Sequence, residues 1–313
     1  MSVSSLHTLY AVLLNTETLG GSSVLFDQIQ SFSISTGLSR IMQRGDGDVD
    51  PTYVSIMSQR PMFGFTTTAL ATALGSCGIG GAEIDNGTYP GIECWFQAMS
   101  EGGVRATGSS HFKMTGAQGI LVPRSIQAAQ DGVATVAFEA ILTYDGSHEP
   151  IVFATSQALS GSPSVGELFT VGPVSINGAA LTAIQGITVD PGISLITAAG
   201  DGDVWPTYVA IQSRDPSIRV STTDVTALST YGLDGTAQGA TDSVVFFRKL
   251  AEGGTRTAEA TAEHISITVD DGMITVENAS VSQDGVASGD LVITPSYDGS
   301  NAIIAISAAA AIA

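Results

Sequence analysis

The 25-residue stretch Gly37–Pro61, GLSRIMQRGDGDVDPTYVSIMSQRP, occurs a second time in the chain as Gly192–Pro216, GISLITAAGDGDVWPTYVAIQSRDP. The two stretches lie 155 residues apart and agree at 15 of their 25 positions. Solenoid repeats are much shorter, roughly 20–50 residues, so a period of this size is that of a whole domain. The stretch therefore indicates that one domain has been duplicated in tandem.

Further matches follow downstream in the same order. Glu101–Arg105 pairs with Glu252–Arg256 at an offset of 151 residues, and three later blocks pair at an offset of 153. Those blocks begin at His111 and His264, at Gln130 and Gln283, and at Tyr144 and Tyr297. We therefore expect two copies of one domain, residues 1–160 and 161–313, joined by the small residues at 160–164.

Strand patterns dominate each copy. Residues alternate in character along 31–35, 133–138 and 264–269, and the apolar run 244–250 ends at a Glu-Gly-Gly turn. Asp-Gly pairs, which tolerate the positive φ of tight turns, recur in both copies. One short helix is expected after Thr66–Thr68, whose hydroxyls can cap it, and another at the matching place after Ser221. The sequence predicts a mainly β fold: two tandem β-sandwich or partly open barrel domains with one short α-helix each.

The composition limits the partners of the chain. Among 313 residues there are 11 Lys and Arg against 30 Asp and Glu, which gives a formal net charge of −19. This charge argues against binding nucleic acid or an anionic membrane through a basic surface, because both need clustered cations. No basic residue precedes the apolar run Leu9–Leu14, so no secretory signal is expected. The apolar run 302–313 is too short to span a bilayer and aligns with 151–159 as a final strand.

Two further motifs have structural interpretations. Cys77 and Cys94 fit no metal or redox spacing, so we expect two buried thiols, with a single disulfide as the alternative. The Gly-rich segment 78–81 lacks the spacing of a phosphate-binding loop, and we interpret it as a flexible loop.

The acidic segment DGDVD at 46–50 resembles the start of a calcium loop, in which alternate carboxylates chelate the cation. It lacks the Gly and the Glu that the EF-hand pattern requires next, and Trp205 replaces Asp50 in the second copy. We therefore predict a turn into the following strand and no metal. The acids kept in both copies are Asp46, Asp48, Asp201 and Asp203.

Two histidines and two arginines are also kept in register, His111 with His264 and Arg105 with Arg256. General base catalysis needs a neighbouring carboxylate or nucleophile, and no such cluster is repeated. We interpret the histidines as hydrogen-bonded strand or interface residues and expect no catalytic residue. In a chain so poor in cations, a retained arginine indicates a bridge to a carboxylate, in the same domain or in a neighbouring subunit.

The order of these motifs resembles the tail tube (major tail) proteins of long-tailed bacteriophages. It comprises the Gly- and acid-rich turn, Pro-Thr-Tyr-Val, a Thr-Thr segment, an aromatic strand ending in Glu-Gly-Gly-x-Arg, a strand with His and a Tyr-Asp-Gly-Ser turn. The resemblance runs through both copies. It implies β-sandwich domains assembled into stacked rings around a central channel, with a duplicated chain forming a homotrimer of pseudo-hexameric symmetry.

The resemblance also implies a setting for the protein. The partners would be further copies of the chain, the tape measure, the tail terminator and distal tail proteins. Double-stranded DNA would pass through the channel without specific binding, and an acidic wall would repel it. The location would be the virion tail, assembled in the host cytoplasm. No segment remains for an immunoglobulin-like decorating domain, so a smooth outer surface is expected.

Three functions are compared on the sequence. The leading hypothesis is a structural virion protein that polymerises into the tail tube. The alternative is another β-rich shell, decoration or surface-layer subunit. An enzyme or a two-domain carbohydrate-binding module is weaker, because no site constellation survives in both copies and aromatic residues make up only 6% of the chain. No cofactor is expected.

Overall fold

The computed structural model describes residues 6–15, 23–84, 89–100, 103–164, 166–200, 202–232, 238–254, 256–281 and 287–312. Within these ranges the chain forms 24 strands and two short helices, which confirms the predicted mainly β class. No helix among the described residues is long and apolar enough to cross a membrane.

The strands of the first copy lie between residues 6 and 157. In chain order they are β1 (Leu6–Leu14), β2 (Val24–Phe26), β3 (Ile29–Ser35), β4 (Leu38–Gln43), β5 (Tyr53–Gln59), β6 (Met62–Thr67), β7 (Ala82–Ile84), β8 (Ile92–Met99), β9 (His111–Gly116), β10 (Gln118–Ala129), β11 (Thr135–Thr143) and β12 (Ile151–Gln157).

The strands of the second copy lie between residues 169 and 310. They are β13 (Phe169–Ile176), β14 (Ala179–Leu181), β15 (Ile184–Asp190), β16 (Ile193–Ala198), β17 (Tyr208–Arg214), β18 (Ser217–Thr222), β19 (Gln238–Ala240), β20 (Ser243–Lys249), β21 (His264–Val269), β22 (Gly272–Ser280), β23 (Ser288–Pro295) and β24 (Ala305–Ala310).

The two copies repeat each other strand for strand. The first has a five-stranded sheet in the order β12-β9-β8-β1-β2, and the second has β24-β21-β20-β13-β14. The first also has β10-β11-β6-β3 with β7 beside β10, and the second has β22-β23-β18-β15 with β19 beside β22. The apolar C-terminal run forms β24, which pairs with β21 as β12 pairs with β9, so the predicted final strand is confirmed.

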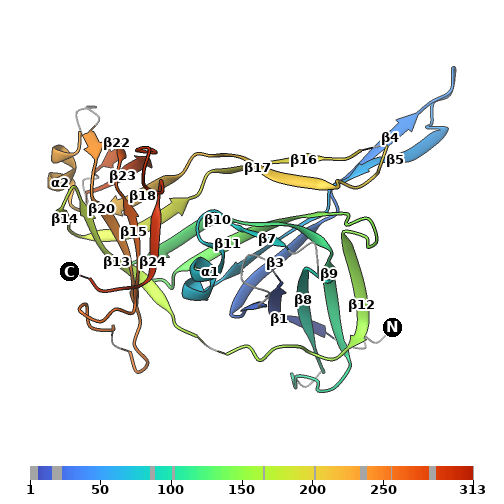
Figure 1. Ribbon diagram of the computed structural model, residues 1–313, viewed down its shortest axis with the longest axis horizontal. Coiled ribbons are helices and arrows are strands. Elements are labelled where there is room, and N and C mark those ends of the chain that lie inside the picture. The colour runs from blue at the N-terminus through green and yellow to red at the C-terminus, as the bar shows by residue number, and fades with distance from the viewer. Residues whose placement is uncertain are drawn as a thin grey trace.

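A single ten-stranded sheet joins the copies. Strand β10 of the first copy pairs antiparallel with β15 of the second, from Ile126 opposite Val189 to Ala129 opposite Gly186 (Figure 1). The apolar side chains of this junction are fully buried, at 0% exposure for Ile126 and Val189. The sequence contains no signal for this pairing, which joins strands of both copies in one continuous sheet.

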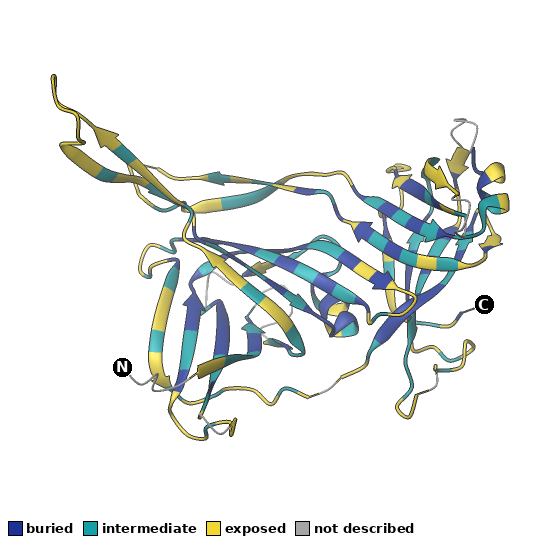
Figure 2. Cartoon of the chain, turned by 180° about the vertical axis from the view of Figure 1, so that it is seen from behind, coloured by how far each residue is buried: buried dark blue, intermediate teal, exposed yellow. Residues whose placement is uncertain are grey.

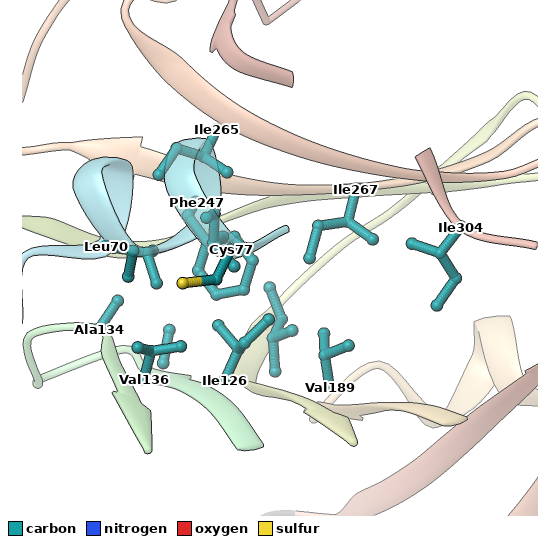
Figure 3. Packing of buried hydrophobic residues seen from close by; sticks show 14 of the residues in the cluster. Leu70, Cys77, Ile126, Ala134, Val136, Val189, Phe247, Ile265, Ile267 and Ile304 are labelled. Atoms are coloured by element: carbon teal, nitrogen blue, oxygen red, sulfur yellow. The ribbon is translucent and has the colours of Figure 1, made fainter. Parts of the chain in front are cut away.

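One hydrophobic core runs through both copies. Figure 3 shows Leu70 and Cys77 from a helix, Ile126 and Val136 from the first copy, and Phe247 and Ile265 from the second, all converging on one apolar layer. Burial of this kind is the main stabilising force in folding.

The two cysteines belong to this core. Cys77 and Cys94 are buried free thiols, as predicted, and form no disulfide. Burial raises the pKa of the Cys77 thiol to about 12. The pKa of Cys94 is also raised, by burial first and then by the neighbouring charge of Glu93.

Both predicted helices are present, as α1 (Leu70–Cys77) and α2 (Val225–Thr230). The predicted threonine cap of α1 is wrong: its N-cap residue is Ala69, which makes no side-chain cap. Thr67 instead accepts a hydrogen bond from the Ala69 amide just before the helix, because its side chain points back into the sheet. Helix α2 has a true cap, since the Asp224 carboxylate accepts from the Ala227 amide at 3.1 Å.

The quoted repeat forms a long β-hairpin in each copy, β4–β5 and β16–β17. Its first residue is Gly37 or Gly192, with φ of +55° or +59°. A Cβ at either position would lie 2.0 Å from the carbonyl oxygen of Arg60 or Asp215, so only glycine fits the base of the hairpin.

Candidate assembly surfaces

Three of the four kept acids, Asp46, Asp48 and Asp203, lie in the turns at the tips of these hairpins. In the first copy the Asp48 amide donates to the Gly45 carbonyl at 3.0 Å, and in the second the Asp203 amide donates to Gly200 at 2.8 Å. Asp46 lies in the same turn, whereas Asp201 lies outside the described residues. The segments therefore form turns, as predicted, and among the described residues no cluster of three or more His, Cys, Asp or Glu could hold a metal.

The paired histidines have matching structural roles. His111 and His264 are buried at the start of β9 and β21, with 1% and 0% exposure. In each the Nδ1 atom accepts from a backbone amide at 3.1 Å, that of Ala98 or Lys249. The Nε2 atom of His264 lies 3.0 Å from the Ala258 carbonyl. These contacts fix the loop between two strands and agree with the interpretation as hydrogen-bonded strand residues.

The paired arginines lie on exposed loops after β8 and β20. Arg105 forms an isolated β-bridge with Met99, and Arg256 forms one with Leu250. Within the described part of the chain neither makes an ion pair, and the nearby carboxylate Glu259 binds Arg248 at 3.0 Å instead. The other half of the interpretation, a carboxylate on a neighbouring subunit, stays a prediction. An Arg256→Ala variant that assembles like the wild type would contradict it.

The hairpin of the second copy lies across the first copy. The Gln59 amide donates to the Val204 carbonyl at 2.8 Å, and the Tyr144 amide donates to the Pro206 carbonyl at 2.8 Å. Between these anchors the Trp205 ring packs 5.6 Å from the Tyr144 ring, centre to centre. Figure 1 shows β16–β17 running along the top of the molecule toward the base of β4–β5.

Among the described residues, nothing supports the tip of the first copy's hairpin in this way. Figure 1 shows β4–β5 extending beyond the rest of the molecule, and Figure 2 shows that most of its residues are exposed. Val49 is 85% exposed where its counterpart Val204 is 37% exposed, and Leu38 is 42% exposed where Ile193 is 4% exposed. An arm with this much exposed apolar surface is typical of a protein interface.

The same asymmetry occurs at the two ends of the ten-stranded sheet. Val281, directly after β22, corresponds to Ala128 of the β10–β15 junction and is 76% exposed, whereas Ala128 is 6% exposed. On β3, Ile34 is 42% exposed, whereas its counterpart Val189 is fully buried. Unpaired edges of this kind invite pairing with another strand.

The face of the ten-stranded sheet that points away from the core is polar, and we call it the outer face. Its arginines are neutralised by neighbouring acids: Arg124 binds Glu139 at 2.7 Å, and Arg219 binds Glu277 and Asp290. The pKa of Asp290 is lowered, first by the hydrogen bond from the Ser221 hydroxyl and also by Asn278 and Arg219. The outer face is thus polar without a free cluster of cations among its described residues.

The sequence predicted a turn into the following strand at residues 46–50, but neither the hairpin nor its role. Sequence reasoning treated the exchange of Asp50 for Trp205 as evidence against a metal, although the exchange marks a difference in what the two tips touch. Compared with known proteins, the chain matches no protein-family model and no curated protein sequence.

Proposed function

We propose that the chain is a structural protein that polymerises head to tail into closed rings, which stack into the tail tube of a long-tailed bacteriophage. One observation carries the proposal: the contact between the two copies uses surfaces whose counterparts are exposed at the two ends of the ten-stranded sheet. The β22 edge of one chain corresponds to β10, and the β3 edge of the next chain corresponds to β15.

The internal junction provides the register for the external one. Ile126 pairs with Val189 and Ala128 pairs with Ile187 inside the chain. The corresponding pairs between chains are Ala279 with Ile34 and Val281 with Phe32. Because the two surfaces differ, the contact is heterologous. Repetition of such a contact closes a ring when its rotation divides the full circle and otherwise gives an open helical filament, and we propose the closed ring.

In the ring, the ten-stranded sheets of successive chains join at β22 and β3. Every chain contributes ten strands to one continuous sheet, so the β3 and β22 edges of that sheet are both paired. Three chains per ring, with six copies in pseudo-sixfold symmetry, is the number that the resemblance to tail tube proteins implies.

In the proposed ring, the outer face of the ten-stranded sheet, which points away from the hydrophobic core, lines the channel for DNA. Duplex DNA carries a negative charge about every 1.7 Å, and unpaired cations along a channel would retain it. The pairing of Arg124 and Arg219 with acids removes such sites, and the net charge of −19 adds repulsion. Screening limits this repulsion to roughly 8 Å at physiological salt, so it acts only where the wall lies close to the DNA.

The test is electron microscopy of the purified full chain, with sedimentation to measure its oligomeric state. We expect rings or tubes with an axial channel. Flat sheets or shells without a channel would favour the decoration or surface-layer alternative, and a monomer at all accessible concentrations would refute the proposal.

A further inference from the structure

The tip of β16–β17 shows how a hairpin tip is received within the chain. Its backbone is held by the Gln59 and Tyr144 amides, both at 2.8 Å. The Trp205 indole N–H donates to the Gln59 side-chain oxygen at 3.3 Å. Pro206, the residue after the tryptophan, is buried by this contact.

The second copy has the same receiving site, open to solvent. The residues 155 after Gln59 and 153 after Tyr144 are Arg214 and Tyr297. With Pro216, Ile79 and Ile304 they line a pocket of about 350 Å³. Arg214 is exposed at its rim, and its guanidinium lies against Gly80, whose lack of a side chain leaves room for it.

The β4–β5 hairpin of the first copy has the matching tip. Like the pocket, this tip has no partner among the described residues. Val49, Asp50 and Pro51 stand where the second copy has Val204, Trp205 and Pro206. All three are exposed, and Pro51 contrasts most clearly with its buried counterpart. Tip and pocket therefore lack the contact that their counterparts make inside the chain.

We propose that the β4–β5 tip of one chain seats in this pocket of the next chain, with Asp50 paired to Arg214. The inference rests on the proposed ring and deepens it. Strand β3 leads directly into β4, so one neighbour can supply both the edge strand and the tip. The Arg214 amide then donates to the Val49 carbonyl, and the Tyr297 amide donates to the Pro51 carbonyl, as their counterparts do within the chain.

The exchange of Trp205 for Asp50 in the tip, and of Gln59 for Arg214 in the receiving site, makes each tip specific for one receiving site. Inside the chain a neutral pair, Trp205 with Gln59, joins tip and receiver, and between chains an opposite charge pair replaces it. Asp50 placed against Gln59 would have no cation to pair with, because Arg214 is absent from that site. Trp205 placed against Arg214 would leave the guanidinium without a carboxylate. The tips therefore select their receivers, which keeps first and second copies alternating around the ring.

A disulfide experiment tests the geometry. Pro51→Cys and Tyr297→Cys are introduced into separate full-length chains, which are mixed and oxidised, so that Asp50 and Arg214 both stay in place. The native Cys77 and Cys94 are buried. We expect a covalent dimer from this mixture. The single-chain variant Pro206→Cys with Tyr144→Cys, at a pair joined by a backbone hydrogen bond of 2.8 Å, is the positive control that this geometry admits a disulfide. Pro51→Cys mixed with Tyr144→Cys is expected to give no dimer.

A charge reversal tests the pair itself. Asp50→Arg or Arg214→Asp alone should raise the concentration needed for assembly by about tenfold or more, because like charges then meet. The double variant should return to within about threefold of the wild type, since the pair is restored with its signs exchanged.

The outcomes separate this inference from the function on which it rests. Wild-type rings without the disulfide, or rings that tolerate both single reversals, would overturn the tip contact and leave the ring standing. A wild-type chain that forms no ring would overturn both.

Discussion

Lysine in place of Ile34 tests the proposed edge contact most directly. The Ile34 side chain is 42% exposed in the single chain, so a lysine there can extend into solvent and the chain should still fold. In the ring this position corresponds to Val189, which is fully buried. The variant therefore places the lysine charge at a position from which the proposed interface excludes water.

The magnitude follows from the burial. Fully burying an isoleucine contributes about 1.5–3 kcal/mol, so covering the remaining 42% contributes roughly 1 kcal/mol at each interface. An unpaired charge in that position adds a desolvation cost of at least about 2 kcal/mol. The sum, about 3 kcal/mol, lowers the association constant between chains by more than about 100-fold.

The assay is sedimentation velocity across a concentration series, with thermal unfolding to confirm that the variant is folded. The matched control is Ser33→Lys, the same substitution one residue earlier, where the side chain points to the outer face. We expect Ile34→Lys to remain monomeric and Ser33→Lys to assemble. If the two variants assembled alike, the reasoning from the β10–β15 junction would be refuted.

Two further predictions concern the outer face. Glu139→Gln frees Arg124 on that face, so assembled tubes should retain DNA more strongly, with a salt dependence of retention steeper by about one charge per site. The control Glu259→Gln frees Arg248, which lies elsewhere, and should not change DNA retention. Equal retention by both variants would contradict the assignment of the outer face to the channel. Ser221→Ala removes the hydrogen bond that contributes most to lowering the pKa of Asp290. A carboxylate with a lowered pKa contributes stability that is fully present above its unfolded pKa of about 3.9 and is lost as the pH falls through the folded pKa. Unfolding curves should therefore show a loss of stability at pH 7 that shrinks as the pH falls through that range, and a loss independent of pH would refute the prediction.

The outcome at particular residues shows how far the sequence alone could go. The sequence located the helix after Thr68, the turns at Asp46 and Asp203, and the hydrogen-bonded histidines at the start of two strands. Each of these features depends on local pattern or on comparison of the two copies. Sequence reasoning placed the cap of α1 wrongly, since the direction of the Thr67 side chain depends on the sheet beneath it.

The sequence by itself determined that the protein is a duplicated β domain, because turn residues, alternation and internal repeats are properties of short segments. Only the tertiary structure decided that β10 pairs with β15, that Trp205 seats on Tyr144, and that Arg214 and Tyr297 line an open pocket. The physical reason is that alternation specifies which face of a strand is buried but not which strand lies beside it. The neighbour is chosen by backbone edges and apolar surfaces that meet only when the whole chain is folded.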